Sequence, residues 1–175
     1  MAELLRGVIP KIFPGWVENQ HWLAVPHNGR SDLEASVPRK LRAWNRPDDR
    51  FIIMRDNDGG DCRAHKARLL RLAEAAPQKR TLVRIVCQEL ESWLLGDLDA
   101  VESAFPSAAR AIRANRRRYP DPDRLTNAAQ ELFKLTQTPG KVGPAKAISV
   151  YMKVEVNLSH SFGVFVEGVR RHASD

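Results

Sequence analysis

One segment of the chain organises the rest of the predicted fold: Phe51-Ile52-Ile53-Met54-Arg55-Asp56-Asn57-Asp58-Gly59-Gly60-Asp61-Cys62. Its first four residues are apolar and two of them are β-branched, which predicts a short strand buried on both faces. The acidic, glycine-rich residues that follow predict a turn at the carboxyl end of that strand. Because open α/β sheets bind ligands at that end, the segment predicts a ligand site there.

The turn carries two carboxylates, Asp56 and Asp58, two positions apart. A bend can aim both at one point, and the glycines let backbone and ligand approach closely. Mg²⁺ or Mn²⁺ is held in this way, by one or two carboxylates together with waters and substrate phosphates. The same residue types are common turn formers, so a solvated turn is the alternative. A calcium loop of the EF-hand type fits poorly, because Asp61 stands where that loop needs glycine and Ala67 where it needs glutamate.

Composition indicates one globular domain of 175 residues, with 43% hydrophobic and 28% charged residues. No window is apolar for long enough to predict a membrane helix. The N-terminus lacks the pattern of a signal peptide, so we expect a cytoplasmic protein. Its two cysteines, Cys62 and Cys87, are then expected to be reduced thiols.

A formal net charge of +7 favours a polyanionic partner such as nucleic acid. The positive charge is concentrated in two groups, and a solvated helix face is the alternative for each. The first group follows the acidic turn and contains Arg63, Lys66, Arg68 and Arg71; the second contains Arg110, Arg113, Arg116, Arg117 and Arg118. We predict that Arg63, Lys66 and Arg71, together with Lys141, contact the nucleic-acid backbone.

Hydrophobic periodicity predicts an α/β fold with a mostly parallel, Rossmann-like sheet flanked by helices. Residues 1–97 form the predicted α/β core, with strands at Trp22–Val25, Phe51–Met54 and Thr81–Val86 and helices at Ala2–Ile12, Leu33–Trp44 and Arg63–Ala75. Residues 98–175 predict a helical C-terminal layer on the sheet, with helices at Leu98–Ala104, Ser107–Asn115, Arg124–Thr136, Gly143–Met152 and Ser159–His172.

Two more carboxylates, Glu89 and Glu91, directly follow the strand Thr81–Val86. There they can face the same crevice as Asp56 and Asp58 and complete a catalytic site. The alternative is that they only favour the start of the next helix through its macrodipole.

Two other motifs are less favourable. Cys62, His65 and Cys87 would give a structural zinc site only three ligands, where four are usual. A phosphate-binding loop at Gly140-Lys141 fails, because Leu135 occupies the position of its first glycine and no strand precedes it.

The strand ending in Asp56-x-Asp58 resembles a bacterial family of Toprim-like proteins, known chiefly as a domain of unknown function. The resemblance covers nearly the whole chain and also rests on three later segments: Glu89-Leu90-Glu91-Ser92-Trp93-Leu94-Leu95, Lys141-Val142-Gly143-Pro144-Ala145 and Asn157-Leu158-Ser159-His160-Ser161-Phe162. Toprim domains occur in topoisomerases, primases and overcoming-lysogenization-defect nucleases. They use an Asp-x-Asp motif to bind Mg²⁺ for phosphodiester chemistry, which the resemblance implies for Asp56 and Asp58.

A Toprim domain also uses a glutamate at the end of a first strand, ahead of its first helix. Here the first predicted helix begins next to Met1, so that strand is missing from the printed sequence. We expect the gene to continue upstream, encoding about five to eight strand residues and a glutamate. The resemblance implies a Mg²⁺-dependent nuclease, and we expect that upstream extension to restore its metal-dependent cleavage. A non-catalytic subunit that binds nucleic acid or an ATPase partner is the alternative, and a sugar-nucleotide or phosphatase motif is a weaker one.

Overall fold

The computed structural model, which describes residues 1–77 and 79–174, contains a sheet of two parallel strands. β1 (Phe51–Asp56) pairs with β2 (Thr81–Val86), with Phe51 opposite Thr81 and Asp56 opposite Val86. Helix α3 (Cys62–Ala73) connects the two strands. The predicted α/β class is confirmed, as are the two strands and their parallel pairing.

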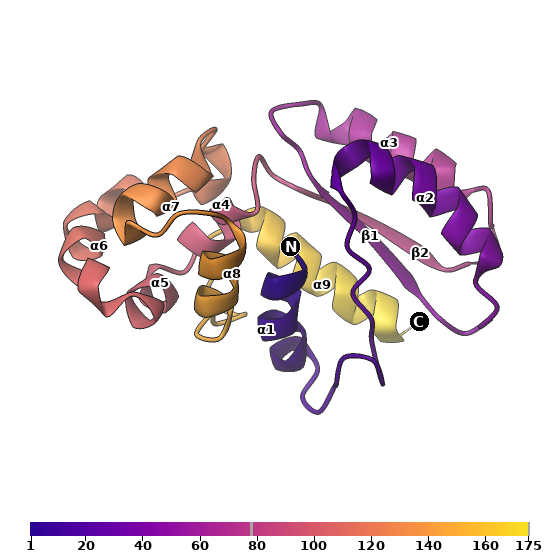
Figure 1. The fold of residues 1–175 in the computed structure, drawn as a ribbon, viewed down its shortest axis with the longest axis horizontal. Coiled ribbons are helices and arrows are strands. Elements are labelled where there is room, and N and C mark those ends of the chain that lie inside the picture. The colour runs from indigo at the N-terminus through magenta and orange to yellow at the C-terminus, as the bar shows by residue number, and fades with distance from the viewer. Residues whose placement is uncertain (78, 175) are drawn as a thin grey trace.

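Helices lie on both faces of the sheet, and side chains alternate between these faces along each strand. Ile53 and Val83 pack with the apolar residues of α2 (Gly29–Ala43) and α3. Val86 belongs instead to the larger core, which includes Phe162 and Phe165 of α9 (His160–Ser174). Figure 1 shows α2 and α3 on one side of the sheet and α9 across the other. The prediction that β1 is buried on both faces is wrong for one face, because Ile52 is exposed and α9 packs mainly against β2.

The second half of the chain is helical, as predicted, but only part of it covers the sheet. Helix α4 contacts α5 and α7, and α6 packs against α5 at the end of the molecule away from the sheet (Figure 1). Helix α1 packs against α8. The bounds are α1 Ala2–Ile12, α4 Glu91–Leu95, α5 Leu98–Ala104, α6 Ala109–Asn115, α7 Ala128–Thr136 and α8 Val142–Ser149. None of the helices in residues 1–77 and 79–174 has the length and apolar character needed to span a bilayer.

The predicted strand Trp22–Val25 is wrong. Trp22 forms a single bridge with Glu18, and residues 23–25 lie outside any strand, with Leu23 and Val25 exposed. Apolar alternation alone does not make a strand, since a strand also needs a hydrogen-bonded neighbour.

Three helix starts also differ from those predicted. The helix predicted at Leu33 begins at Gly29, where Asp32 accepts a hydrogen bond from the Asn28 N–H and thereby satisfies a donor at the helix start. The predicted helix at Ser107–Asn115 opens with a 3₁₀ turn, Pro106–Ala108, and that at Arg124–Thr136 follows another, Pro122–Arg124.

A cavity of about 1200 Å³ runs along the edge of β1 that faces away from β2. Every residue from Phe51 to Asp56 lines it, together with the extended residues 22–27 and parts of α1 and α2. Phe51 and Asn57 donate their N–H groups to the β2 side. Because backbone direction alternates along a strand, the N–H and C=O groups of Ile52 and Met54 point toward the cavity.

Candidate metal centre

The loops that follow the two strands are tied together by backbone hydrogen bonds. The N–H of Asn57 donates to the carbonyl oxygen of Val86 at 3.0 Å, and that of Asp58 donates to Gln88 at 3.0 Å. Asp58 and Gln88 both have left-handed backbone conformations, with φ of 51° and 58°, which aspartate tolerates better than most residues. These bonds bring the segment that follows β2 to the turn that carries Asp58.

The backbone of the turn favours glycine at one position. Gly59 has a φ of 74°, a conformation that glycine adopts without steric cost. Gly60 lies against the imidazole of His65 in the first turns of α3, so a larger residue there would displace that side chain. The turn therefore folds tightly back onto α3 and keeps Asp58 exposed at its tip.

Asp56 is the most perturbed carboxyl group at this end of the sheet. Burial raises its pKa to about 6, and repulsion from Asp58 and Glu91 adds to that effect. Lys141 and the amino group of Met1 oppose the rise without cancelling it. Its Oδ1 atom is buried and has no hydrogen-bond partner. An ionised Asp56 therefore has too little positive charge and too few hydrogen-bond donors around it.

Glu91 is the second buried carboxylate at the site, with 2% of its surface exposed. Its Oε2 atom has no hydrogen-bond partner and lies 3.7 Å from Nζ of Lys141. This separation allows attraction but is too long for a hydrogen bond. Repulsion from Glu91 acts on Asp56, so the two carboxylates lie near each other. Glu91 does not line the cavity that Asp56 and Asp58 line, so the structure does not show the predicted shared crevice.

Glu89 is engaged with the chain itself. Its Oε2 accepts a hydrogen bond from the N–H of Ala129 in the first turn of α7, and its Oε1 accepts one from Nζ of Lys141 at 3.1 Å. It therefore favours the start of a helix, but that helix is α7 and not α4. Burial lowers the pKa of Lys141, but attraction to Glu89, Glu91 and Asp56 outweighs it, so the pKa is raised overall.

The donor set fits a hard divalent cation. No three His, Cys, Asp or Glu side chains among the described residues are already grouped tightly enough to hold a metal. Two buried carboxylate oxygens, Oδ1 of Asp56 and Oε2 of Glu91, nevertheless accept no hydrogen bond, and carboxylate oxygens are the ligands that Mg²⁺ and Mn²⁺ prefer. The exposed Asp58 adds a third carboxylate near Asp56.

The basic residues predicted to contact nucleic acid occupy different places. Three of them, Arg63, Lys66 and Arg71, are exposed on α3 and form no side-chain ion pair within residues 1–77 and 79–174. Lys141 lies apart from them, among the carboxylates.

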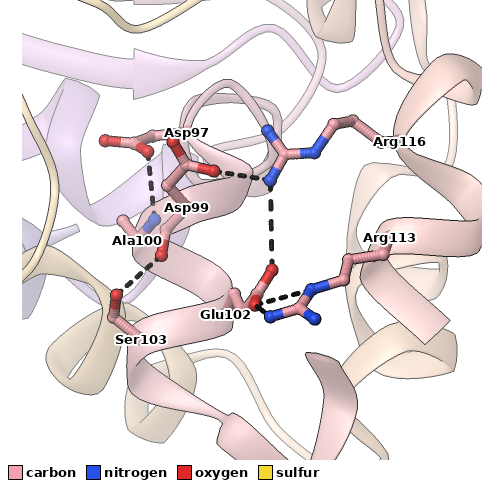
Figure 2. A network of polar contacts seen from close by, with 7 residues as sticks. All are labelled: Asp97, Asp99, Ala100, Glu102, Ser103, Arg113 and Arg116. Carbon is pink, nitrogen blue, oxygen red and sulfur yellow. Dashed lines mark hydrogen bonds and ion pairs between the residues drawn. The ribbon is translucent and has the colours of Figure 1, made fainter. Parts of the chain in front are cut away.

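The second basic group is partly neutralised, as Figure 2 shows. Arg113 pairs with Glu102, and Arg116 pairs with Asp99 and lies 4.0 Å from Glu102. These pairs link α6 and the turn after it to α5. For Arg113 and Arg116, pairing across a solvated surface is the simpler interpretation.

Sequence reasoning missed a buried arginine beside the predicted site. Arg55 is 7% exposed, and its guanidinium lies 3.7 Å from both Glu34 on α2 and Asp58. The signal was present, because a charged residue inside a strand flanked by helices must find partners there. Side chains two positions apart in a strand lie on the same face of the sheet, so Arg55 lies on the face of Ile53, toward α2 and α3.

A family model described as a domain of unknown function (DUF4276) matches residues 2–170. No curated protein and no solved structure matches the chain.

Proposed function

The chain belongs to the DUF4276 family, and we propose that it is a Mg²⁺- or Mn²⁺-dependent protein that hydrolyses phosphodiester bonds in nucleic acid. The observation that carries this proposal is a pair of buried carboxylate oxygens, on Asp56 and Glu91, that accept no hydrogen bond. Lys141 lies 3.7 Å from the oxygen of Glu91 and compensates only part of this negative charge. Burying an ionised oxygen that accepts no hydrogen bond is costly, and a bound cation would relieve that cost. The resemblance of Asp56-x-Asp58 to the Toprim motif supports the same assignment.

Asp56 and Asp58 would hold the metal, and Glu91 would complete the site. A bound Mg²⁺ polarises a phosphate oxygen and lowers the pKa of an attacking water. With its pKa near 6, Asp56 is mostly ionised at neutral pH and can act as a ligand. The free Oε2 of Glu91 can serve as a further ligand or accept a proton. Glu89 is assigned a positioning role, because both of its oxygens are occupied by Ala129 and Lys141.

Calorimetry with Mn²⁺ tests the metal site directly. We expect binding to the wild-type chain and none to the double variant Asp56→Ala, Asp58→Ala. A matched control removes two exposed carboxylates elsewhere, in the double variant Asp99→Ala, Glu155→Ala. Equal uptake by all three proteins would refute the site. Mg²⁺ is the weaker probe, because substrate phosphates often supply part of its coordination shell.

Cleavage of labelled single-stranded and duplex oligonucleotides with Mn²⁺ tests the reaction. We expect products from the wild-type chain and none from Asp56→Ala. Salt-sensitive binding without cleavage would favour the alternative function, a non-catalytic subunit that docks nucleic acid or an ATPase partner. In either case, charge reversal of Arg63, Lys66 and Arg71 should reduce the salt dependence of binding.

A further inference from the structure

Three arginines from three elements surround one glutamate on the face of the sheet that carries α2 and α3. Nε of Arg30 on α2 donates to Oε1 of Glu34 at 3.0 Å, and Nε of Arg68 on α3 donates to Oε2 at 2.7 Å. Arg55 on β1 brings its Nη1 to 3.7 Å from Oε1 of the same glutamate. These three arginines form the arginine cluster. Because Arg55 also lies 3.7 Å from Asp58, two carboxylates face three guanidinium groups, and one positive charge stays uncompensated.

Arg55 is the fixed centre of the cluster. Its Nε donates to the backbone carbonyl of Asp56 at 2.9 Å, and its Nη2 lies 3.7 Å from Oδ2 of Asp58. Both carboxylates near its terminal nitrogens are beyond hydrogen-bond distance. Its Nη1 is buried and makes no hydrogen bond. A guanidinium has five N–H donors, so this one remains short of acceptor oxygens.

The cluster opens beside the metal-ligand candidates. The side chains of Arg30 and Arg68 are each 53% exposed, whereas that of Glu34 is 11% exposed. Arg30 and Arg55 line the same cavity as Asp56 and Asp58. An anion inside this cavity can therefore contact Arg30 and Arg55 near the carboxylates, while Arg68 lies outside the cavity lining.

We propose that Arg30, Arg55 and Arg68 form an anion subsite that binds a backbone phosphate of the nucleic acid, next to the phosphate that is cleaved. The subsite rests on the proposed function and names the part of the substrate that this surface takes. Arginine suits the role because its planar fork matches phosphate oxygens in pairs. Glu34 holds two of the forks in place before the ligand arrives, and Arg55 is held by the backbone of β1.

The alternative is an ion-pair network that only joins α2 to α3. A structural network and a phosphate subsite differ in one measurable respect, which is the effect of the exposed arginines on nucleic-acid affinity. The double variant Arg30→Gln, Arg68→Gln removes two charges and keeps polar side chains of similar length. The matched control, Arg113→Gln, Arg116→Gln, removes two paired arginines at the other end of the molecule (Figures 1 and 2).

Fluorescence anisotropy with an oligonucleotide of about 20 nucleotides, in salt from about 50 to 200 mM, measures the affinity and its salt slope. We expect the cluster variant to bind at least about tenfold more weakly, with a slope smaller by about 1, since the subsite neutralises one phosphate and each neutralised phosphate contributes about 1. The control should change both quantities far less. Equal losses in the two variants, or no loss in the cluster variant, would overturn the proposal.

Two further measurements separate the possible failures. Mn²⁺ calorimetry on the cluster variant should match the wild-type chain, so a defect in the metal site is distinguishable from a defect in the subsite. Arginine modification by phenylglyoxal, read by mass spectrometry, tests the wild-type chain even if the variant unfolds. The oligonucleotide should protect Arg30 and Arg68 but not Arg113 and Arg116. Absence of that difference also overturns the proposal.

Discussion

Replacing Asp56 by asparagine should stabilise the protein at neutral pH. The folded structure raises the pKa of this carboxyl from 3.8 to about 6, mainly through burial and then through Asp58 and Glu91. Each pH unit corresponds to about 1.4 kcal/mol, so keeping Asp56 ionised costs about 3 kcal/mol above pH 6. Asparagine has nearly the same shape and carries no charge. We expect the variant to gain about 2–3 kcal/mol near pH 7.5, or about 5–10 °C in Tm for a domain of this size.

The pH dependence of the stability gain in Asp56→Asn shows whether the charge of Asp56 is its cause. Between about pH 4 and pH 6 the folded chain keeps a proton on Asp56 that the unfolded chain has lost, so stability falls as the pH rises. Above that range the deficit is constant. The gain from Asp56→Asn should therefore shrink below about 1 kcal/mol near pH 4. Urea unfolding followed by circular dichroism, at about pH 7.5 and about pH 4, measures this gain in the free energy of unfolding.

Asp99→Asn is the control, because this exposed carboxylate pairs with Arg116 at the surface (Figure 2). Its removal should not stabilise the protein, since surface pairs contribute between about 0 and 1 kcal/mol. A variant Asp56→Asn that is no more stable than wild type at neutral pH would refute the cost assigned to Asp56. An equal gain at both pH values would refute its electrostatic cause. With saturating Mn²⁺ the wild-type chain, and not the variant, should gain stability.

Two further results are expected. The variant Lys141→Met removes the cation shared by three carboxylates. The pKa of Asp56, followed by NMR, should then rise above about 6, and the stability at neutral pH should fall by about 1–3 kcal/mol. An unchanged pKa would show that Lys141 does not act on Asp56. The backbone amides of Ile52 and Met54 face the cavity, whereas that of Ile53 faces β2. Hydrogen exchange should therefore be faster at Ile52 and Met54 than at Ile53. Equal protection of the three amides would mean that the outer edge of β1 is also hydrogen-bonded.

The parts of the fold that sequence predicts well are those set by neighbouring residues. Phe51–Asp56 and Thr81–Val86 are strands because short apolar runs rich in β-branched residues suit a buried sheet. The apolar residues of Trp22–Val25 gave a similar signal without a strand, since its formation depends on a partner that the local pattern does not contain.

In the candidate site, too, sequence predicts some contacts and not others. Parallel strands end at one edge of a sheet, which correctly predicts that Glu91 lies near Asp56. The two partners of Glu89, Ala129 and Lys141, are 40 and 52 positions away in sequence. No local pattern predicts such contacts, because they depend on how α7 and α8 pack against α4.

The adjacency of Arg55 and Asp56 explains why the proposed metal centre and the arginine cluster can serve one substrate. Alternation along β1 sends Arg55 toward α2 and α3, and sends Asp56 toward Glu91 and Lys141. Asp58, held in a left-handed turn beyond the strand end, lies close to both side chains. A shift of the strand by one residue would exchange the two faces and separate these groups. The fixed pairing of β1 with β2 therefore sets a positive and a negative side chain on either side of one turn, so that the proposed metal and the proposed phosphate subsite lie next to each other.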